Sequence, residues 1–135
     1  MEAAFALPIF ALVLVGTIDF GRLFYKTMAV THAARAGVQY GTYIPGLAND
    51  DPGMESAALG AGSIDIPSGL TAAANHECFC YTGGAETSMI CTAACGGQTR
   101  VYVTVTASAT FTTVMNYPGI PNSVAIVRAA RMRAK

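Results

Sequence analysis

The stretch AAFALPIFALVLVGTI, residues 3–18, is the part of the chain from which its architecture follows, because none of its sixteen residues is charged. Sixteen helical residues span about 24 Å, somewhat less than the roughly 30 Å hydrocarbon core of a bilayer. The apolar residues of 20–25, with Asp19 and Arg22 able to pair at i,i+3, extend the helix to membrane length. The helical pattern continues further, so we expect one long α-helix over residues 1–43.

Three interpretations of this helix compete: a secretory signal peptide, a single-pass membrane anchor, and a helix that leaves the bilayer to form the core of a filament. The signal peptide is disfavoured because no basic region precedes the apolar run. Glu2 favours the filament, since a carboxylate beside an apolar run is costly unless it pairs, and the α-amino group of a neighbouring copy is a suitable partner. A place for Glu2 in the lipid headgroup region is the equal alternative. Pro8 removes a helical hydrogen bond, which neighbouring helices can compensate.

A stripe of small residues follows the apolar run. Ala29, Ala33, Gly37 and Gly41 recur at intervals of four and therefore share one face of the helix. Such stripes let helix backbones approach closely, so we expect these residues to form contacts between copies. The alternative is an ordinary Ala-rich amphipathic face. A neighbouring apolar stripe, Val30, Ala34 and Val38, suits packing on a globular unit.

The remaining residues, 44–135, are expected to form a small globular unit. A short helix is predicted at about 52–59, and strands at about 72–81, 100–111 and 123–132. The strand at 100–111 is the clearest, because apolar and hydroxyl side chains alternate along it. A turn is expected at Tyr117-Pro118-Gly119. The predicted fold class is therefore α+β, with an antiparallel sheet behind a long helix.

Composition limits the function. Lys and Arg number 8, Asp and Glu also number 8, and only 12% of the residues are charged. No basic field exists to attract phosphate groups, so we expect no nucleic-acid partner. A surface so poor in charge favours being covered, by lipid or by copies of the same chain. No nucleophile–base–acid set is visible in the sequence, so we expect neither an enzyme nor a cofactor.

Four cysteines, Cys78, Cys80, Cys91 and Cys95, lie close together in the sequence. An even, clustered set beside a membrane segment favours disulfides in an oxidising compartment. We prefer pairings in which each of the first two cysteines joins one of the last two. A zinc site that includes His76 is the weaker alternative, because Cys78-x-Cys80 is too tight for a typical knuckle. No metal is therefore expected.

The N-terminal residues resemble a known family. Glu2-x-x-Phe5-Ala6-Leu7-Pro8, followed by an apolar run and by GTIDFGR at 16–22, is similar to the N-terminal signature of TadE-like pseudopilins of tight-adherence pilus systems. The stretch AARAGVQY at 33–40 is similar to a second family pattern. Family precursors carry a basic leader before the glutamate, whereas Glu2 is the second residue here; a processed form and a lost start both explain this difference.

The resemblance implies a function. It implies export by a prepilin peptidase, residence in the inner membrane as a precursor, and then packing by the pilus assembly machinery into an extracellular filament, or fimbrium, built from many copies. It gives Glu2 a role in aligning incoming subunits. The assembly residues expected from the sequence and the family together are Glu2, Phe5, Pro8, Asp19, Arg22, Ala29, Ala33, Gly37 and Gly41. The alternative function is a membrane-anchored or secreted binding module stabilised by disulfides, such as an adhesin.

Overall fold

The computed structural model describes residues 2–63, 65–66, 68–115, 119 and 121–134. Side chains are described from Ala6 onwards, except for that of Pro45. The chain has the predicted α+β fold. Its elements are α1 (Glu2–Tyr43), the 3-10 helix η1 (Pro45–Asn49), α2 (Asp51–Gly62), β1 (Leu70–Thr82), β2 (Ala85–Met89), β3 (Gln98–Thr112) and β4 (Ser123–Arg133). The turn expected at Tyr117-Pro118-Gly119 lies largely outside the described residues.

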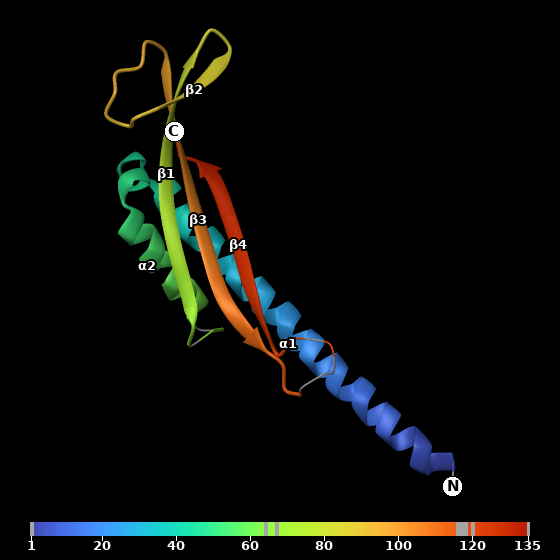
Figure 1. Ribbon diagram of the computed structural model, residues 1–135. Helices are drawn as coiled ribbons and strands as arrows, with labels where there is room; N and C mark the ends of the chain where they lie inside the picture. The colour runs from blue at the N-terminus through green and yellow to red at the C-terminus, as the bar shows by residue number, and fades with distance from the viewer. Residues whose placement is uncertain (1, 64, 67, 116–118, 120, 135) are drawn as a thin grey trace.

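Helix α1 dominates the shape of the molecule. Its 42 residues extend over about 63 Å at 1.5 Å per residue, and the helix runs through Pro8 without ending. Figure 1 shows that the C-terminal part of α1 lies along the sheet, whereas the N-terminal part projects away from all other elements. We call residues 6–18 the rod and the described residues from 19 onwards the head.

Helix α2 is longer than the predicted 52–59. Asp50 caps its first turn, where the carboxylate accepts a hydrogen bond from the backbone N–H of Gly53 at 3.1 Å. The helix then continues to Gly62. The prediction took Gly60 and Gly62 as the stop, but the helix passes through Gly60 and ends at Gly62. A Cβ on Gly62 would lie 2.3 Å from Cδ2 of Leu70, so this glycine also permits close packing of the helix on β1.

The sheet is antiparallel, with the strand order β2-β1-β3-β4. Strands β1, β3 and β4 correspond to the three predicted strands and are slightly longer than predicted. The alternation expected along β3 is present: Val103, Val105, Ala107, Ala109 and Phe111 are buried under the helices. The hydroxyl residues between them lie on the opposite face of the sheet.

Strand β2 was not predicted from the sequence. It pairs with the end of β1 through a two-residue turn, Gly83-Gly84, in which both residues have positive φ, at 60° and 91°. Positive φ at both central positions is typical of a type I′ hairpin turn, and glycine adopts it without strain.

The core forms between the second half of α1, helix α2 and the inner face of the sheet. One cluster is built mainly around Ala29, Val30, Ala33, Ala34, Ala107, Ala109, Phe111 and Ile126. The other contains Val38, Ala48, Met54, Ala58, Val103 and Val105. The core therefore crosses the expected boundary at residue 43, and the C-terminal half of α1 is an integral part of the head.

Candidate functional site

The rod presents an exposed apolar surface around its whole circumference. Leu7, Phe10 and Leu12 are 65%, 65% and 64% exposed, and successive helical residues are about 100° apart, so these side chains point in different directions. By length and composition α1 is able to cross a membrane, and only 6% of its apolar window is buried inside the subunit. A helix that is hydrophobic all round is covered by lipid or by protein in its working state.

Asp19 joins the rod to the head. The side chain is almost completely buried, and both carboxylate oxygens accept the backbone N–H of Val114 at 3.1 Å. Arg22 donates to the same carboxylate at 3.1 Å, in the i,i+3 geometry expected from the sequence. The Arg22 guanidinium also lies over the ring of Phe111, 5.6 Å from its centroid. Because Phe111 and Val114 lie at the end of β3 and just after it, these contacts fix the direction in which the rod leaves the head.

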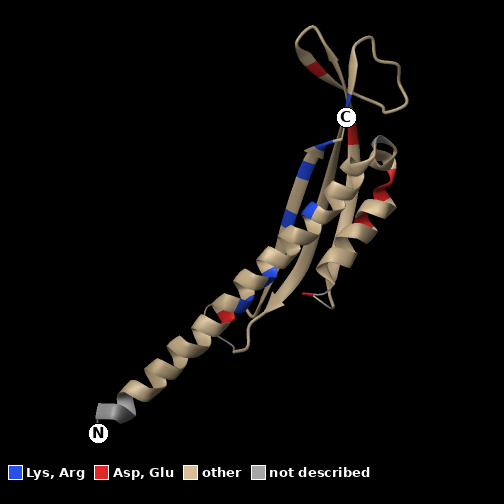
Figure 2. Ribbon diagram, turned by 180° about the vertical axis from the view of Figure 1, so that it is seen from behind, with Lys and Arg blue, Asp and Glu red and all other residues tan. Residues whose placement is uncertain are grey.

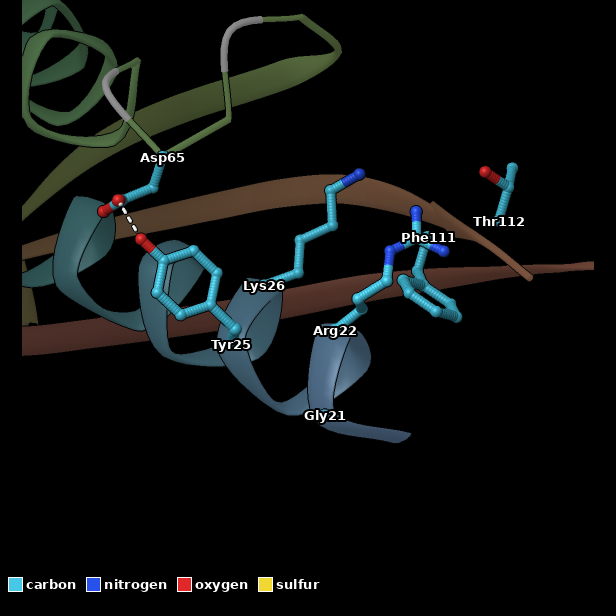
Figure 3. Close-up of a pocket in the computed structure, with 7 residues that line it drawn as sticks. All are labelled: Gly21, Arg22, Tyr25, Lys26, Asp65, Phe111 and Thr112. Carbon is cyan, nitrogen blue, oxygen red and sulfur yellow. Dashed lines mark hydrogen bonds between the residues drawn. The ribbon is translucent and has the colours of Figure 1, made fainter. Parts of the chain in front are cut away.

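A pocket of about 350 Å³ opens beside this junction (Figure 3), lined by Gly21, Arg22, Tyr25, Lys26, Asp65, Phe111 and Thr112. The Tyr25 hydroxyl donates a hydrogen bond to Asp65, and Lys26 Nζ donates to the carbonyl of Thr110 at 2.8 Å. Tyr, Lys and Arg side chains have an apolar stem and a polar tip, which suits a membrane–water interface. The junction thus has the composition of a boundary between an apolar and an aqueous layer.

The small-residue stripe packs within its own subunit. Ala29, Ala33, Gly37 and Gly41 are all buried within their own subunit. A Cβ on Gly37 would lie 2.8 Å from the backbone oxygen of Met54, and one on Gly41 would lie 2.3 Å from Met54 Sδ. The stripe therefore lets α2 approach α1 closely. The approach of α2 supports the alternative, packing within one chain, for Gly37 and Gly41. A contact of the four residues with another copy stays a prediction.

The other predicted assembly residues lie towards the free end of α1. Glu2 and Phe5 are helical, but their side chains are outside the described part of the structure. Pro8 is exposed on the rod. Figure 1 places this end of the helix far from the head. The pairing of Glu2 with another copy therefore stays a prediction.

Two disulfides fasten the tip of the head, which comprises the β1–β2 hairpin and the loop that leads to β3 (Figure 1). Cys78 is bonded to Cys91, and Cys80 is bonded to Cys95. Each bond joins one of the first two cysteines to one of the last two, as preferred from the sequence. The sulfurs are thereby unavailable to zinc. His76 Nδ1 instead contacts the carboxylate of Asp51, on α2, at 2.9 Å.

A cluster of arginine, aromatic and acidic side chains, not predicted from the sequence, lies on the sheet face away from the helices. The Arg131 guanidinium lies 4.8 Å from the ring centroid of Tyr102 and donates to Glu77 at 3.0 Å. The rings of Phe79 and Tyr102 meet edge to face, with centroids 5.5 Å apart. Period-2 alternation in β1 and β3 puts these residues on one face, but only the strand register brings them together.

Arg100 extends the same cluster towards β2. It lies over the Tyr81 ring, 3.8 Å from the centroid, and forms an ion pair with Glu86. The hydrogen bond from Arg100 lowers the pKa of Glu86 below its usual range, and a further hydrogen bond from the Tyr102 hydroxyl at 3.2 Å acts in the same direction. The side chains of this cluster come from all four strands and bond to one another. Their main effect is therefore to hold the four strands in register at the tip end of the sheet.

The rod and its junction with the head lie in the part of the chain that matches a known protein family. No curated protein and no solved structure matches the chain. The model of one protein family matches residues 1–39, which contain the rod, Asp19 and Arg22. These residues match the TadE-like proteins, which confirms the resemblance found in the sequence.

Proposed function

We propose that this protein is a structural subunit of a pilus-type filament, held in the inner membrane by its rod before assembly and packed through the same rod afterwards. The rod is the observation that carries the proposal. Its large apolar side chains, such as Leu7 and Phe10, are about two-thirds exposed on a folded, disulfide-bonded subunit. Covering one such side chain stabilises the covered state by about 1.5–3 kcal/mol, so a rod with several of them strongly favours lipid or neighbouring rods over water.

The junction supports a subunit of this kind. Asp19 and Arg22 hold the rod in a defined direction relative to the head, so identical subunits can be added in identical orientations. Glu2 remains the candidate for pairing with the α-amino group of a neighbouring copy inside the apolar core of the filament, where an unpaired carboxylate is costly. Both features would serve assembly, and they support a structural role for the protein.

The experiment introduces a charge on the rod and compares it with the same change elsewhere. Val13→Asp changes a rod residue that is 59% exposed, and Ile90→Asp changes a tip residue that is 77% exposed. Each variant is expressed at normal levels in cells that have the assembly machinery, and surface filaments are counted by electron microscopy with antibody labelling of the head. We expect Val13→Asp to abolish filaments and Ile90→Asp to leave their number unchanged, because an aspartate in an apolar rod core is costly.

Head integrity is checked in both variants by the disulfide content and by far-UV circular dichroism in detergent. The proposal is wrong if wild-type cells carry no labelled filaments, or if Val13→Asp filaments are as numerous as the wild type. Wild-type protein that stays monomeric in detergent and at the cell surface and binds a ligand through the head would instead establish the membrane-anchored binding module.

A further inference from the structure

The charges of the head are divided between two opposite edges of the sheet. Figure 2 shows Lys and Arg along β4 and on the adjoining part of α1, and Asp and Glu at the start of α2. Strand β4 is one edge of the sheet, and α2 packs on β1 towards the other edge. We call Arg35, Arg128 and Arg131 the basic edge, and Asp50, Asp51 and Glu55 the acidic edge.

A groove runs along the basic edge. It has a volume of about 530 Å³ and lies between α1 and β4, where its lining residues are Thr31, Arg35, Gln39, Ala129, Ala130, Arg131 and Met132. Arg35 is exposed and, among the described residues, has no carboxylate partner within salt-bridge distance. Arg128 is exposed, and among the described residues it donates a hydrogen bond only to the carbonyl of Val127, at 2.9 Å. Arg131 is paired with Glu77 at 3.0 Å, so the uncompensated positive charge in the groove is that of Arg35, and Arg128 lies next to the groove on β4.

The acidic edge carries the opposite charge. Asp50 accepts hydrogen bonds from the Gly53 N–H and from the Tyr40 hydroxyl, both of which are neutral donors. Glu55 accepts the backbone N–H of Ala74 at 3.0 Å. In the described part of the chain no Arg or Lys forms a salt bridge with either carboxylate. These contacts hold Asp50 and Glu55 in place without neutralising them, whereas Asp51 contacts His76 Nδ1 at 2.9 Å.

The two edges lie at the same level along the sheet. Glu55 contacts Ala74, and the strand register aligns Ala74 with Val105 and Val105 with Ala130, which lines the groove. A neighbouring copy placed beside the sheet would therefore bring its acidic edge level with the groove.

We propose that the groove between α1 and β4 of one copy binds the start of α2 of the next copy. This inference rests on the proposed function, because it describes how heads pack in the filament. The two surfaces are different and lie on opposite edges, so each added copy leaves one groove and one α2 free. Such a heterologous contact propagates as an open helical array instead of closing as a symmetric dimer.

The experiment introduces opposite charge at each edge, at positions that bond to no described side chain of the same subunit. The groove variant is Arg35→Glu with Arg128→Glu. The helix variant is Pro52→Lys with Ser56→Lys, two exposed positions one turn apart on α2 that leave the contacts of Asp51 and Glu55 in place. A photo-reactive phenylalanine analogue replaces Gln39, which is exposed and lines the groove. Full-length chains labelled with heavy and normal nitrogen are mixed, irradiated as filaments or at high concentration in detergent, and analysed by mass spectrometry.

We expect heavy–light cross-links from position 39 to residues 51–63, and about a tenfold lower yield in either charge variant, because each variant introduces two like-charge contacts across the interface. An equimolar mixture of the two variants should restore the yield, since the two glutamates added to the groove then meet the two lysines added to α2. The same analogue at Ser88, on the exposed tip, is the control and should not cross-link to α2.

Filaments that form normally in both charge variants, with cross-links to other segments, overturn this docking mode and leave the filament proposal intact. Cross-links between α2 and the groove in detergent, without filaments, support the docking mode and contradict the filament. Wild-type chains that give neither filaments nor cross-links overturn both.

Discussion

The carboxylate of Asp19 accepts the backbone N–H of Val114, a residue 95 positions later in the chain, with both of its oxygens at 3.1 Å. This contact connects the end of the apolar rod to the segment that follows β3. A buried carboxylate bound by a backbone N–H and an arginine is a strong, charge-assisted arrangement. This contact therefore adds to the orientation of the rod, which the packing of the rest of α1 on the sheet also sets.

Replacement of Asp19 should loosen this junction. We expect Asp19→Ala to reduce the free energy of unfolding by about 1–3 kcal/mol, because the Val114 N–H loses a charged acceptor. Amide hydrogen exchange at Val114 should become faster, measured by mass spectrometry or NMR in detergent. Arg22→Gln is the matched control: it removes the ion pair and keeps the backbone contact, so it should cost at most about 1 kcal/mol. Equal exchange rates at Val114 in Asp19→Ala and wild type would contradict this role.

The contact between α1 and α2 should be sensitive to a single methyl group. Gly37→Ala would place a Cβ 2.8 Å from the backbone oxygen of Met54, which cannot move as a side-chain end can. We expect it to lower the free energy of unfolding by about 1–3 kcal/mol in urea denaturation. Gly60→Ala is the control, because its Cβ would meet nothing within 4 Å; it should stabilise the protein by up to about 1 kcal/mol. If both changes have the same sign, the packing described for the stripe is incorrect.

The disulfides should contribute a large part of the stability of the tip. The bonded cysteines are 13 and 15 residues apart, and closing a loop of this size is worth about 3 kcal/mol in the chain-entropy model. We expect Cys80→Ser with Cys95→Ser to lower the melting temperature, measured by circular dichroism. Reductant should lower the melting temperature of this variant further, because Cys78–Cys91 remains. A wild-type protein whose melting temperature does not respond to reductant would argue against both bonds.

The ion pair between Arg100 and Glu86 should make stability depend on pH. The pKa of Glu86 is lower in the folded protein than in the unfolded chain, so the pair stabilises the fold above the unfolded pKa, and this contribution is lost as pH falls through the folded value. Glu86→Gln should therefore melt below the wild type at pH 7, and the difference should disappear between about pH 5 and pH 3. Thr87→Ala, at the neighbouring exposed position, should show a difference that does not vary with pH.

The parts of the fold that depend on local pattern were predictable from the sequence. An uncharged run predicts the long helix, and the alternation along β3 predicts which side chains lie beneath α1. Strand β2 was missed because its sequence, AETSM, is mostly polar and exposed, and its pairing depends on the positive φ of Gly83 and Gly84. Helix α2 was predicted too short because glycine was taken as a stop, whereas Gly62 is a packing position.

The face of the helix or strand on which a side chain lies was easier to predict than the residues that the side chain contacts. Spacing at i+4 shows that Gly37 and Gly41 share a stripe, but it does not show that the approaching helix is α2 of the same chain. Arg131, Tyr102 and Phe79 come together only through the register of three strands, which no short pattern contains. The burial of Asp19 could likewise not be predicted from the sequence, because its partner Val114 is far away in the chain.

The sequence of the loop between β2 and β3 can change while the loop stays attached to the head. Its residues from Thr92 to Gly97 are exposed except for Cys95, and two covalent bonds hold it to β1 regardless of which side chains lie between the cysteines. Substitutions at Thr92, Ala93 or Ala94 thus alter the outermost surface without disturbing the hydrophobic core. This loop is a natural place for changes of sequence, and for the insertion of a short epitope tag.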